Sequence, residues 1–446
     1  MKLSTSLSCI AFAMFPFMTN IMGQTAATAE TANPPAESQV SLGENVKMKI
    51  GGFARADFFY DTRKNVEILD GLLDMYPLNK SLDANGKDIN DVSLLRMSAA
   101  ASRLNAKFTG PDFLNAKTSS LVEFDFTGVN GIGLRLRHAW VKLNWEKTEL
   151  LFGRFWHPMF ILDAFPTVLA LSTGAPFCVF NRAEQLRFTY NLGQISFMAA
   201  AAGQMDYGFS SEYNSATGAT SYLHNQIMPD ITVNAQFKND NIIFGASANY
   251  KVNQPRLYTQ DASTPANKYK TDEKIASLSA QAYAQYKTGL LKIKGGALYG
   301  ENMMELLMMG GYAVKTIDTV TFKETYSTVN NLNYWCNIVY GDKLQAILFV
   351  GYMQNLGTVD KQIVGFTKNS ARGYDEKGNG IANMIRIAPG VAYKVGRVQM
   401  HLELEHSITA YGKYTNAANV INENAEVKDT KNISNTRVQF ATIFYF

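Results

Sequence analysis

The feature that most constrains this chain is a strict alternation of apolar and other residues, which is clearest in its last segment, 434–446. Side chains of an extended strand point alternately to its two faces. One face carries Val438, Phe440, Thr442, Phe444 and Phe446, and the other carries Arg437, Gln439 and Ala441. The ends of soluble domains are usually solvated and frayed, so they rarely need such an apolar final strand. A transmembrane β-barrel does need one, because its last strand closes the barrel and places aromatic side chains at the lipid headgroups.

The same alternation recurs along most of the chain, broken by turn residues. Sixteen segments qualify as strands: 47–61, 94–108, 117–127, 134–146, 150–156, 185–192, 194–205, 231–238, 242–252, 275–287, 290–299, 329–340, 343–354, 384–395, 397–408 and 437–446. In the second segment the alternation slips phase near Ser102, which indicates a β-bulge. Tight turns such as 191–193 and 288–289 alternate with long connections such as 206–229 and 300–328. The pattern predicts an all-β fold, a transmembrane antiparallel β-barrel of about 16 strands.

The composition supports a barrel over other membrane and soluble folds. Hydrophobic residues make up 46% of the 446 residues and charged residues only 18%, whereas charged residues form about a quarter of a soluble domain. A mean hydropathy close to zero excludes a bundle of membrane helices, but it fits a barrel in which alternate residues face lipid. A soluble β-sandwich is disfavoured because its strands typically have about five or six residues. The net charge of +4 does not point to nucleic acid as a partner.

The N-terminus predicts export. Lys2 precedes an apolar segment, 7–18, and cleavage could follow Gly23 or Ala29, so we expect residues 1–23 to be a signal peptide. Residues 24–45 are polar and rich in Ala, Thr and Pro, which predicts a flexible periplasmic lead-in. The barrel then occupies residues 46–446.

Arginine is concentrated on the polar faces of the predicted strands. The candidates for the lumen are Arg55, Arg96, Arg103, Arg135, Arg137, Arg154, Arg182, Arg187 and Arg386. Lipid cannot surround them, because Arg at the bilayer midplane of a barrel costs roughly 2–4 kcal/mol. One interpretation is a ladder that attracts anions along the pore. The other is that they pair with acids and brace the wall, the candidate acids being Asp57, Glu123, Asp125, Asp163, Glu403 and Glu405. The sequence leaves both open.

Residues 157–181, between two predicted strands, are too apolar for an ordinary surface loop. They could fold inward and constrict the lumen, pack at a subunit interface, or form a further pair of strands. Asp163, Arg154 and Arg182 lie within or beside this segment and would be the charges that it positions.

Several short motifs are similar to one family of membrane proteins. They are GGFARADFFYD, ASRLNAKFTG, LVEFDFTG, LRLRHAWVKL, LLFGRFWHPMF and NRAEQLRFTY. In this order they resemble the DcaP-like outer-membrane porins and, more distantly, the phosphate-selective porins O and P. The resemblance implies a trimeric, sixteen-stranded diffusion channel with a basic lumen that favours small anions such as dicarboxylates. The C-terminal Phe440, Phe444 and Phe446 resemble the signature read by the assembly machinery of the Gram-negative outer membrane.

An enzyme is disfavoured, because neither an H-E-x-x-H pattern nor a G-x-S-x-G elbow is present. His401, Glu403 and Glu405 share a strand face that His406 does not, so they cannot converge on a metal. Cys178 and Cys336 are expected to be isolated thiols rather than a disulfide. We therefore expect no catalytic residue, no metal and no cofactor. The sequence predicts an anion-favouring porin in outer-membrane lipid; the alternative is a non-conducting barrel that serves as a surface adhesin or structural protein.

Overall fold

The computed structural model describes residues 39–43, 45–128, 133–203, 213–214, 219–220, 223, 225–260, 267–367 and 369–446. It divides the chain into two units, Met1–Gln39 and Val40–Phe446. The predicted signal peptide, 1–23, and most of the predicted lead-in, 24–45, lie outside the described residues. The description below concerns the second unit.

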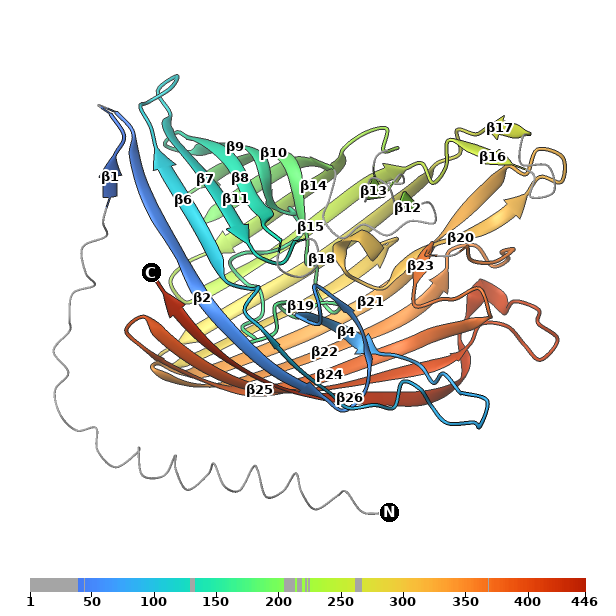
Figure 1. Ribbon diagram of the computed structural model, residues 1–446. Helices are drawn as coiled ribbons and strands as arrows, with labels where there is room; N and C mark the ends of the chain where they lie inside the picture. Colours follow the sequence, from blue (N-terminus) through green and yellow to red (C-terminus); the bar gives the residue numbers. More distant parts are fainter. Residues whose placement is uncertain are drawn as a thin grey trace, which may run out of the picture. The chain divides into compact units, whose positions relative to one another are not determined.

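The second unit is a closed barrel of sixteen antiparallel strands (Figure 1). The wall comprises β2 (Lys47–Asp61), β5 (Leu94–Ser98) continued by β6 (Arg103–Thr109), β7 (Lys117–Asp125), β8 (Arg135–Asn144), β9 (Thr148–Trp156), β10 (Arg182–Leu192), β11 (Ile195–Gly203), β14 (Asp230–Lys238), β15 (Ile242–Asn253), β18 (Ile275–Thr288), β19 (Leu291–Glu301), β21 (Glu324–Gly341), β22 (Leu344–Thr358), β24 (Asn379–Val395), β25 (Val398–Lys413) and β26 (Lys428–Tyr445). All sixteen predicted strands are present, so the predicted fold class is confirmed.

Shorter elements decorate this wall or its connections. They are β1 (Gln39–Ser41), β3 (Asn65–Ile68), β4 (Leu73–Pro77), β12 (Tyr213–Asn214), β13 (Ala219–Thr220), β16 (Tyr258–Gln260), β17 (Lys268–Lys270), β20 (Gly310–Ile317), β23 (Ala371–Arg372) and the 3-10 turns η2 (Met304–Leu306) and η3 (Glu423–Ala425). In the part of the chain that the structure describes, no helix has the length and apolarity to span a bilayer.

The first and last strands of the wall close the barrel. β26 pairs with β2 in continuous register from Phe53 opposite Tyr445 to Asp61 opposite Arg437. The alternation along β26 is as predicted: Phe444 is 47% exposed on the outward face, whereas Ala441 on the inward face is fully buried. The period-two pattern therefore sorts lipid-facing from lumen-facing side chains.

The phase slip predicted near Ser102 is a break between β5 and β6. β2 pairs with Ser98 through Asp57 and with Arg103 through Phe53, so residues 99–102 lie opposite the three residues 54–56. One extra residue is thus accommodated in the second strand, as in a bulge. The insertion keeps Arg96 and Arg103 on the inward face of the wall despite their odd separation.

Several strands extend beyond their predicted ends. β26 begins at Lys428 rather than 437, and β21 begins at Glu324 rather than 329. The added residues of β26 are mostly exposed and polar, including Lys428, Thr430 and Lys431. They lack apolar alternation, which is why the sequence pattern did not mark them as strand.

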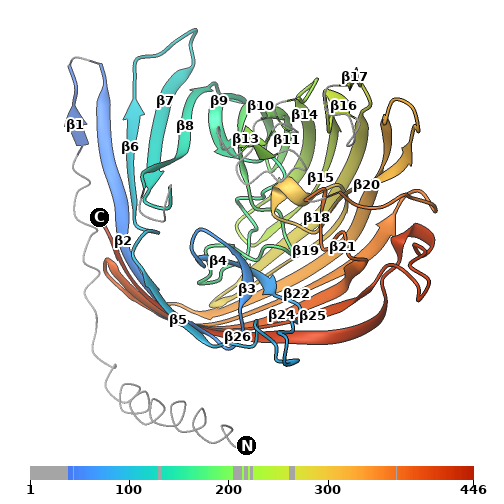
Figure 2. The same cartoon turned by 45° about the vertical axis from the view of Figure 1, so that its right-hand side comes forward.

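Three connections fold into the barrel and share one apolar core (Figure 2). They are the β3–β4 hairpin, the connection 157–181 between β9 and β10, which we call the strap, and the segment 302–309 after β19. Leu73 of the hairpin, Phe177 of the strap and Met308 of the third segment are all fully buried in it. We call this cluster the lumen core. Its apolar side chains explain why these three connections turn inward instead of being solvated.

Candidate pore constriction

Side chains of the barrel wall hold the strap at its backbone. From β19, Lys294 Nζ donates to Phe165 O at 2.8 Å and to Thr167 Oγ1 at 2.9 Å. From β21, the Asn337 amide accepts from Thr167 N at 2.8 Å and donates to Thr167 O at 3.1 Å. These contacts satisfy strap backbone groups that would otherwise be buried without partners.

Two further wall strands hold the following residues of the strap. The Glu403 carboxylate on β25 accepts from Leu169 N at 2.8 Å and from Ala170 N at 3.2 Å. On β2, Arg55 Nη2 donates to Leu169 O at 2.9 Å. The strap leaves the wall at β9 and is bound by β19, β21, β25 and β2, so it crosses inside the barrel. The interpretation that the strap folds inward is confirmed, and it contains no strand pair.

The strap also packs against a position of the wall that has no side chain. Gly351 on β22 faces Phe177, and a Cβ at Gly351 would lie 2.4 Å from a ring carbon of Phe177. Only glycine leaves room for the ring at this position, because contacts that short do not occur between unstrained carbon atoms. Phe177 therefore fixes the strap in a slot of the wall.

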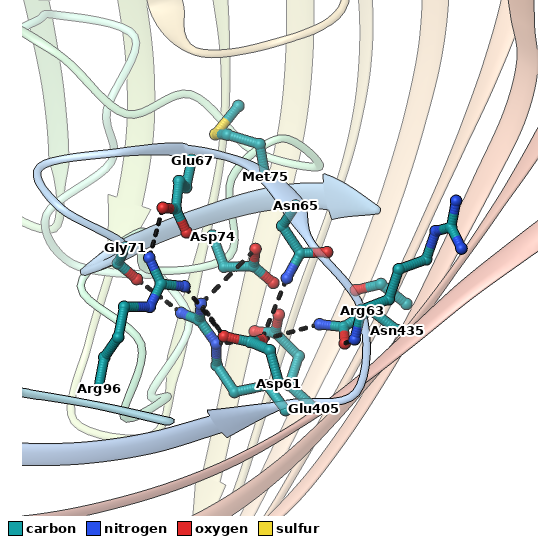
Figure 3. Close-up of polar contacts among 12 residues, drawn as sticks. Asp61, Arg63, Asn65, Glu67, Gly71, Asp74, Met75, Arg96, Glu405 and Asn435 are labelled. Carbon is teal, nitrogen blue, oxygen red and sulfur yellow. Dashed lines mark hydrogen bonds and ion pairs between the residues drawn. The ribbon is translucent and has the colours of Figure 1, made fainter. Parts of the chain in front are cut away.

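A buried network of charges fixes the β3–β4 hairpin (Figure 3). The Asp61 carboxylate accepts from Arg437 Nε at 2.9 Å, from Arg437 Nη2 at 2.8 Å and from Arg96 Nη2 at 3.1 Å. Asn435 donates to the same carboxylate at 2.9 Å. Arg437 in turn donates to Gly71 O of the hairpin at 2.7 Å. Charged groups on β2, β5 and β26 thus anchor the β3–β4 hairpin inside the barrel.

Arg386 on β24 joins the hairpin to the strap. Its guanidinium donates to Met75 O of the hairpin and to Ala175 O of the strap, both at 2.9 Å. Its carboxylate partners are Glu405 at 3.2 Å and, more distantly, Asp74 at 3.9 Å. Arg386 is only 1% exposed, so it braces the lumen core and offers no charge to a passing solute.

The segment 302–309 is held in a similar way. Lys251 on β15 forms an ion pair with Glu305, and both side chains are almost fully buried. From β21, Asn331 Nδ2 donates to Met309 O at 2.8 Å. Polar side chains of the wall therefore bind the backbone of each of the three inward segments, and in segment 302–309 they also bind Glu305.

A second group of arginines lies on the wall beside the start of the strap. Arg135 and Arg137 on β8 bind Asp125 at 2.8 and 2.7 Å, and Arg137 also binds Glu123 at 2.9 Å. Arg103 on β6 is the least tightly paired, because its Nε lies 3.5 Å from Glu123. This Nε is buried and has no hydrogen-bond partner among the described residues.

Arg182 adds to the charge of this group. Its guanidinium stacks on the Trp156 ring, with a distance of 4.2 Å from Cζ to the ring centroid. Three arginines (Arg103, Arg135 and Arg137) thus contact two carboxylates (Glu123 and Asp125), and Arg182 lies beside them on Trp156. We call these six charged residues the arginine cluster.

The remaining predicted site residues are distributed along the wall. Arg55 pairs with Asp57 at 2.6 Å, and Arg96 pairs with Asp61. Arg187 donates to Trp156 O at 2.8 Å and has no carboxylate within ion-pair distance among the described residues. Asp163 of the strap pairs with Lys238 rather than with an arginine.

Arg154 pairs with an acid of the neighbouring strand, and its place in the lumen stays a prediction. Arg154 lies opposite Glu184 in the β9–β10 register and pairs with it at 2.6 Å. The same register puts Phe152 opposite Leu186, and both of these side chains are exposed on the outward face. Trp156, two residues after Arg154, and Arg182 opposite it both lie inside the barrel beside Arg137. Alternation along β9 therefore does not assign Arg154 to the outward face.

The charges that anchor the lumen core were largely missed from the sequence. Asp61 and Arg437 were read only as inward-facing positions, and Lys251 and Glu305 were not noted. One signal was available in the sequence. Residues 302–311, NMMELLMMGG, are as apolar as the strap and also lie between two predicted strands. Applying the same argument to them would have predicted a second inward connection.

The faces predicted for His401 and His406 and the free thiols predicted for the two cysteines agree with the structure. His401 is buried on the inward face of β25, while His406 lies on the other face and contacts Thr436. In the described chain, no cluster of His, Cys, Asp or Glu could hold a metal ion. Cys178 and Cys336 are both free thiols, as predicted.

Comparison with solved structures identifies the fold. The outer membrane channel DcaP of Acinetobacter baumannii superposes with a TM-score of 0.63 at 17% sequence identity, covering 90% of this chain and 98% of that one. OmpT, an outer-membrane protein of Vibrio cholerae, gives 0.53 at 11% identity and covers 92% of this chain and 100% of its own. The anion-selective porin of Comamonas acidovorans gives 0.51 at 12% identity, with 90% and 100% covered. No protein-family model and no curated protein sequence matches the chain.

These likenesses confirm the predicted resemblance to DcaP-like porins at the level of fold. The chain has the architecture of sixteen-stranded outer-membrane porins. This architecture supports the predicted location in the outer membrane of a Gram-negative bacterium.

Proposed function

We propose that this chain is a porin, through which small hydrophilic solutes diffuse passively across the outer membrane, with a preference for small anions. The observation that carries the proposal is a closed barrel crossed by an inward strap, beside which four arginines gather in the arginine cluster. A low-dielectric wall focuses the field of such charges and raises the local concentration of anions. In this proposal the strap limits the size of the solute and the arginine cluster biases its charge. Transport is passive diffusion and involves no catalysed reaction.

Dicarboxylates are the first solutes to test, because the resemblance to DcaP-like porins implies them. A homotrimer is part of the same proposal: an OmpT structure with this fold is described as a trimer form. The outward apolar face ending in Phe444 and Phe446 would serve insertion into lipid by the assembly machinery.

The deciding experiment is the reversal potential of the refolded protein in a planar bilayer under a KCl gradient. We expect ohmic conductance with a reversal potential of the sign that indicates chloride preference. The double variant Arg103→Gln/Arg135→Gln should move the potential towards zero, because it removes two positive charges beside the strap. Lys117→Gln is the matched control and should leave the potential unaltered, because Lys117 forms an exposed ion pair with Asp112 at the other end of the β6–β7 pair. A cation-selective channel would refute the anion preference and leave the porin.

The lumen core favours one alternative, a barrel that does not conduct. Three inward segments bury apolar side chains inside the wall, and such a core could block the lumen. The protein would then serve as a surface adhesin or structural barrel. Absence of conductance from protein that is shown to be folded would support this alternative.

A further inference from the structure

A pocket lies where the arginine cluster meets the lumen core. Its volume is about 170 Å³, and Arg103, Arg135 and Arg137 form one side of it. The other side is apolar and comes from two inward segments: Leu69 and Leu73 of the hairpin, and Phe160, Phe165 and Leu171 of the strap. Trp156 lies between the two sides and carries Arg182 on its ring.

We propose that this pocket binds a monocarboxylate with a compact apolar body, such as an aromatic carboxylate, with the carboxylate on Arg103 and the ring against the strap. The proposal rests on the porin function above and assigns a preferred class of solute to the constriction. It predicts a solute that is retained at the constriction, in addition to the small anions that merely pass it.

The charge of the ligand follows from the arginines. Arg103 forms a longer ion pair than Arg135 and Arg137, 3.5 Å from Glu123, and its side chain is 21% exposed. Arg135 is 16% exposed, while Arg137 is almost fully buried between Glu123 and Asp125. A planar guanidinium binds a carboxylate through two parallel hydrogen bonds, so Arg103 can receive an anion that the wall acids leave unmatched.

A second donor lies on the strap side. The Thr173 hydroxyl lines the pocket, is buried, and has no hydrogen-bond partner among the described residues. Buried hydroxyl groups are normally paired, so an unpaired one in a pocket marks a place where a polar ligand atom is missing. It is available to donate to a ligand oxygen.

The apolar body of the ligand follows from the opposite side. A dry cavity of about 150 Å³ lined by Leu, Ile and Phe is large enough for benzene. The pocket here is of that size and offers aromatic rings at Trp156 and Phe160, which stack on each other at 4.2 Å. A dicarboxylate would have to bury its second charge against Leu73, Phe165 and Leu171, which is unfavourable without a partner.

The proposal is tested by titrating the refolded, full-length protein in detergent with benzoate, benzyl alcohol and succinate, following tryptophan fluorescence and heat by calorimetry. Benzoate has both the charge and the ring, benzyl alcohol lacks the charge, and succinate lacks the ring. We expect benzoate to bind at least tenfold more tightly than either. The variant Trp156→Phe should remove the fluorescence change but not the heat.

Two variants assign the two sides of the pocket. Arg103→Gln should weaken benzoate binding about tenfold, as expected for loss of one charge-assisted hydrogen-bonded pair. Leu171→Gln should weaken it as well, while Lys117→Gln, in an exposed ion pair away from the pocket, should not. Heat-modifiable migration in electrophoresis verifies that each variant is a folded barrel.

Each outcome separates this inference from the porin function. Anion-selective conductance without benzoate binding would overturn the inference and leave the porin. Equal binding of benzyl alcohol, or of succinate, would also overturn it, because one of the two sides would then be irrelevant. Benzoate binding that depends on Arg103 in a barrel without conductance would support the pocket and refute the porin.

Discussion

Asp61 is the residue whose substitution tests most directly how the lumen core is held. Its two carboxylate oxygens accept from Arg437, Arg96 and Asn435 in a region with almost no solvent access (Figure 3). Asp61→Asn keeps the shape of the side chain and one acceptor oxygen. It replaces the other oxygen, which accepts from Arg437 and Arg96, with an amide that can only donate.

The magnitude follows from the contacts that are lost. Two charge-assisted hydrogen bonds disappear, each of which contributes about 1.5–3 kcal/mol. Removing one partner of a buried ion pair typically costs about 3–5 kcal/mol, so both arguments lead to a loss of about 4 kcal/mol. Since about 1.4 kcal/mol corresponds to a factor of ten, the equilibrium constant for docking the hairpin inside the barrel should fall about a thousandfold.

The assay is equilibrium unfolding in urea at fixed detergent, followed by tryptophan fluorescence in both directions to establish reversibility. Asp163→Asn is the matched control, because its ion pair with Lys238 is 37% and 52% exposed. An exposed pair contributes about 0–1 kcal/mol, so the control should change the free energy of unfolding by no more than that. If Asp61→Asn falls in the same range as the control, the buried network does not anchor the hairpin. A rise in single-channel conductance of the Asp61 variant would independently report release of the hairpin from the lumen.

Three further predictions concern other parts of the barrel. Gly351→Ala should lower the free energy of unfolding by about 1–3 kcal/mol, because the new methyl group overlaps the Phe177 ring; a stability equal to wild type would show that the strap can shift freely. In the connection between β22 and β23, a hydrogen bond from Lys315 lowers the pKa of the Asp360 carboxyl below 3.8, so this contact should be complete at pH 6 and lost as the pH falls below 3.8. Limited proteolysis should therefore cut this connection faster at pH 3 than at pH 6, and Lys315→Met should remove the difference. Cys336, exposed on β21, should react in vesicles with a membrane-permeable maleimide and not with a charged one; equal reaction with both would place it in water.

The strands could be predicted because the signal for them is local. Alternation with period two marks both faces of a strand within a few residues, as in β2, where the prediction and the structure share the bounds Lys47–Asp61. The strap could be predicted for a related reason, since an apolar connection of its length has to be buried somewhere. Its inward course was one of three possibilities, and only the contacts from Lys294, Asn337 and Glu403 decide between them.

What the sequence by itself determined is the closed barrel, its lipid face and the crowding of arginines on its inner face. Which acid each arginine meets was decided by the tertiary structure, because the register of distant strands sets those distances. Asp61 and Arg437 lie 376 positions apart in the chain and form one ion pair only because the first and last strands close the barrel. Arg154 meets Glu184 only because the β9–β10 register sets the two residues opposite each other. Local pattern fixes the face of a residue where the alternation is strong, but charge balance depends on contacts between distant strands, and those form only in the folded barrel.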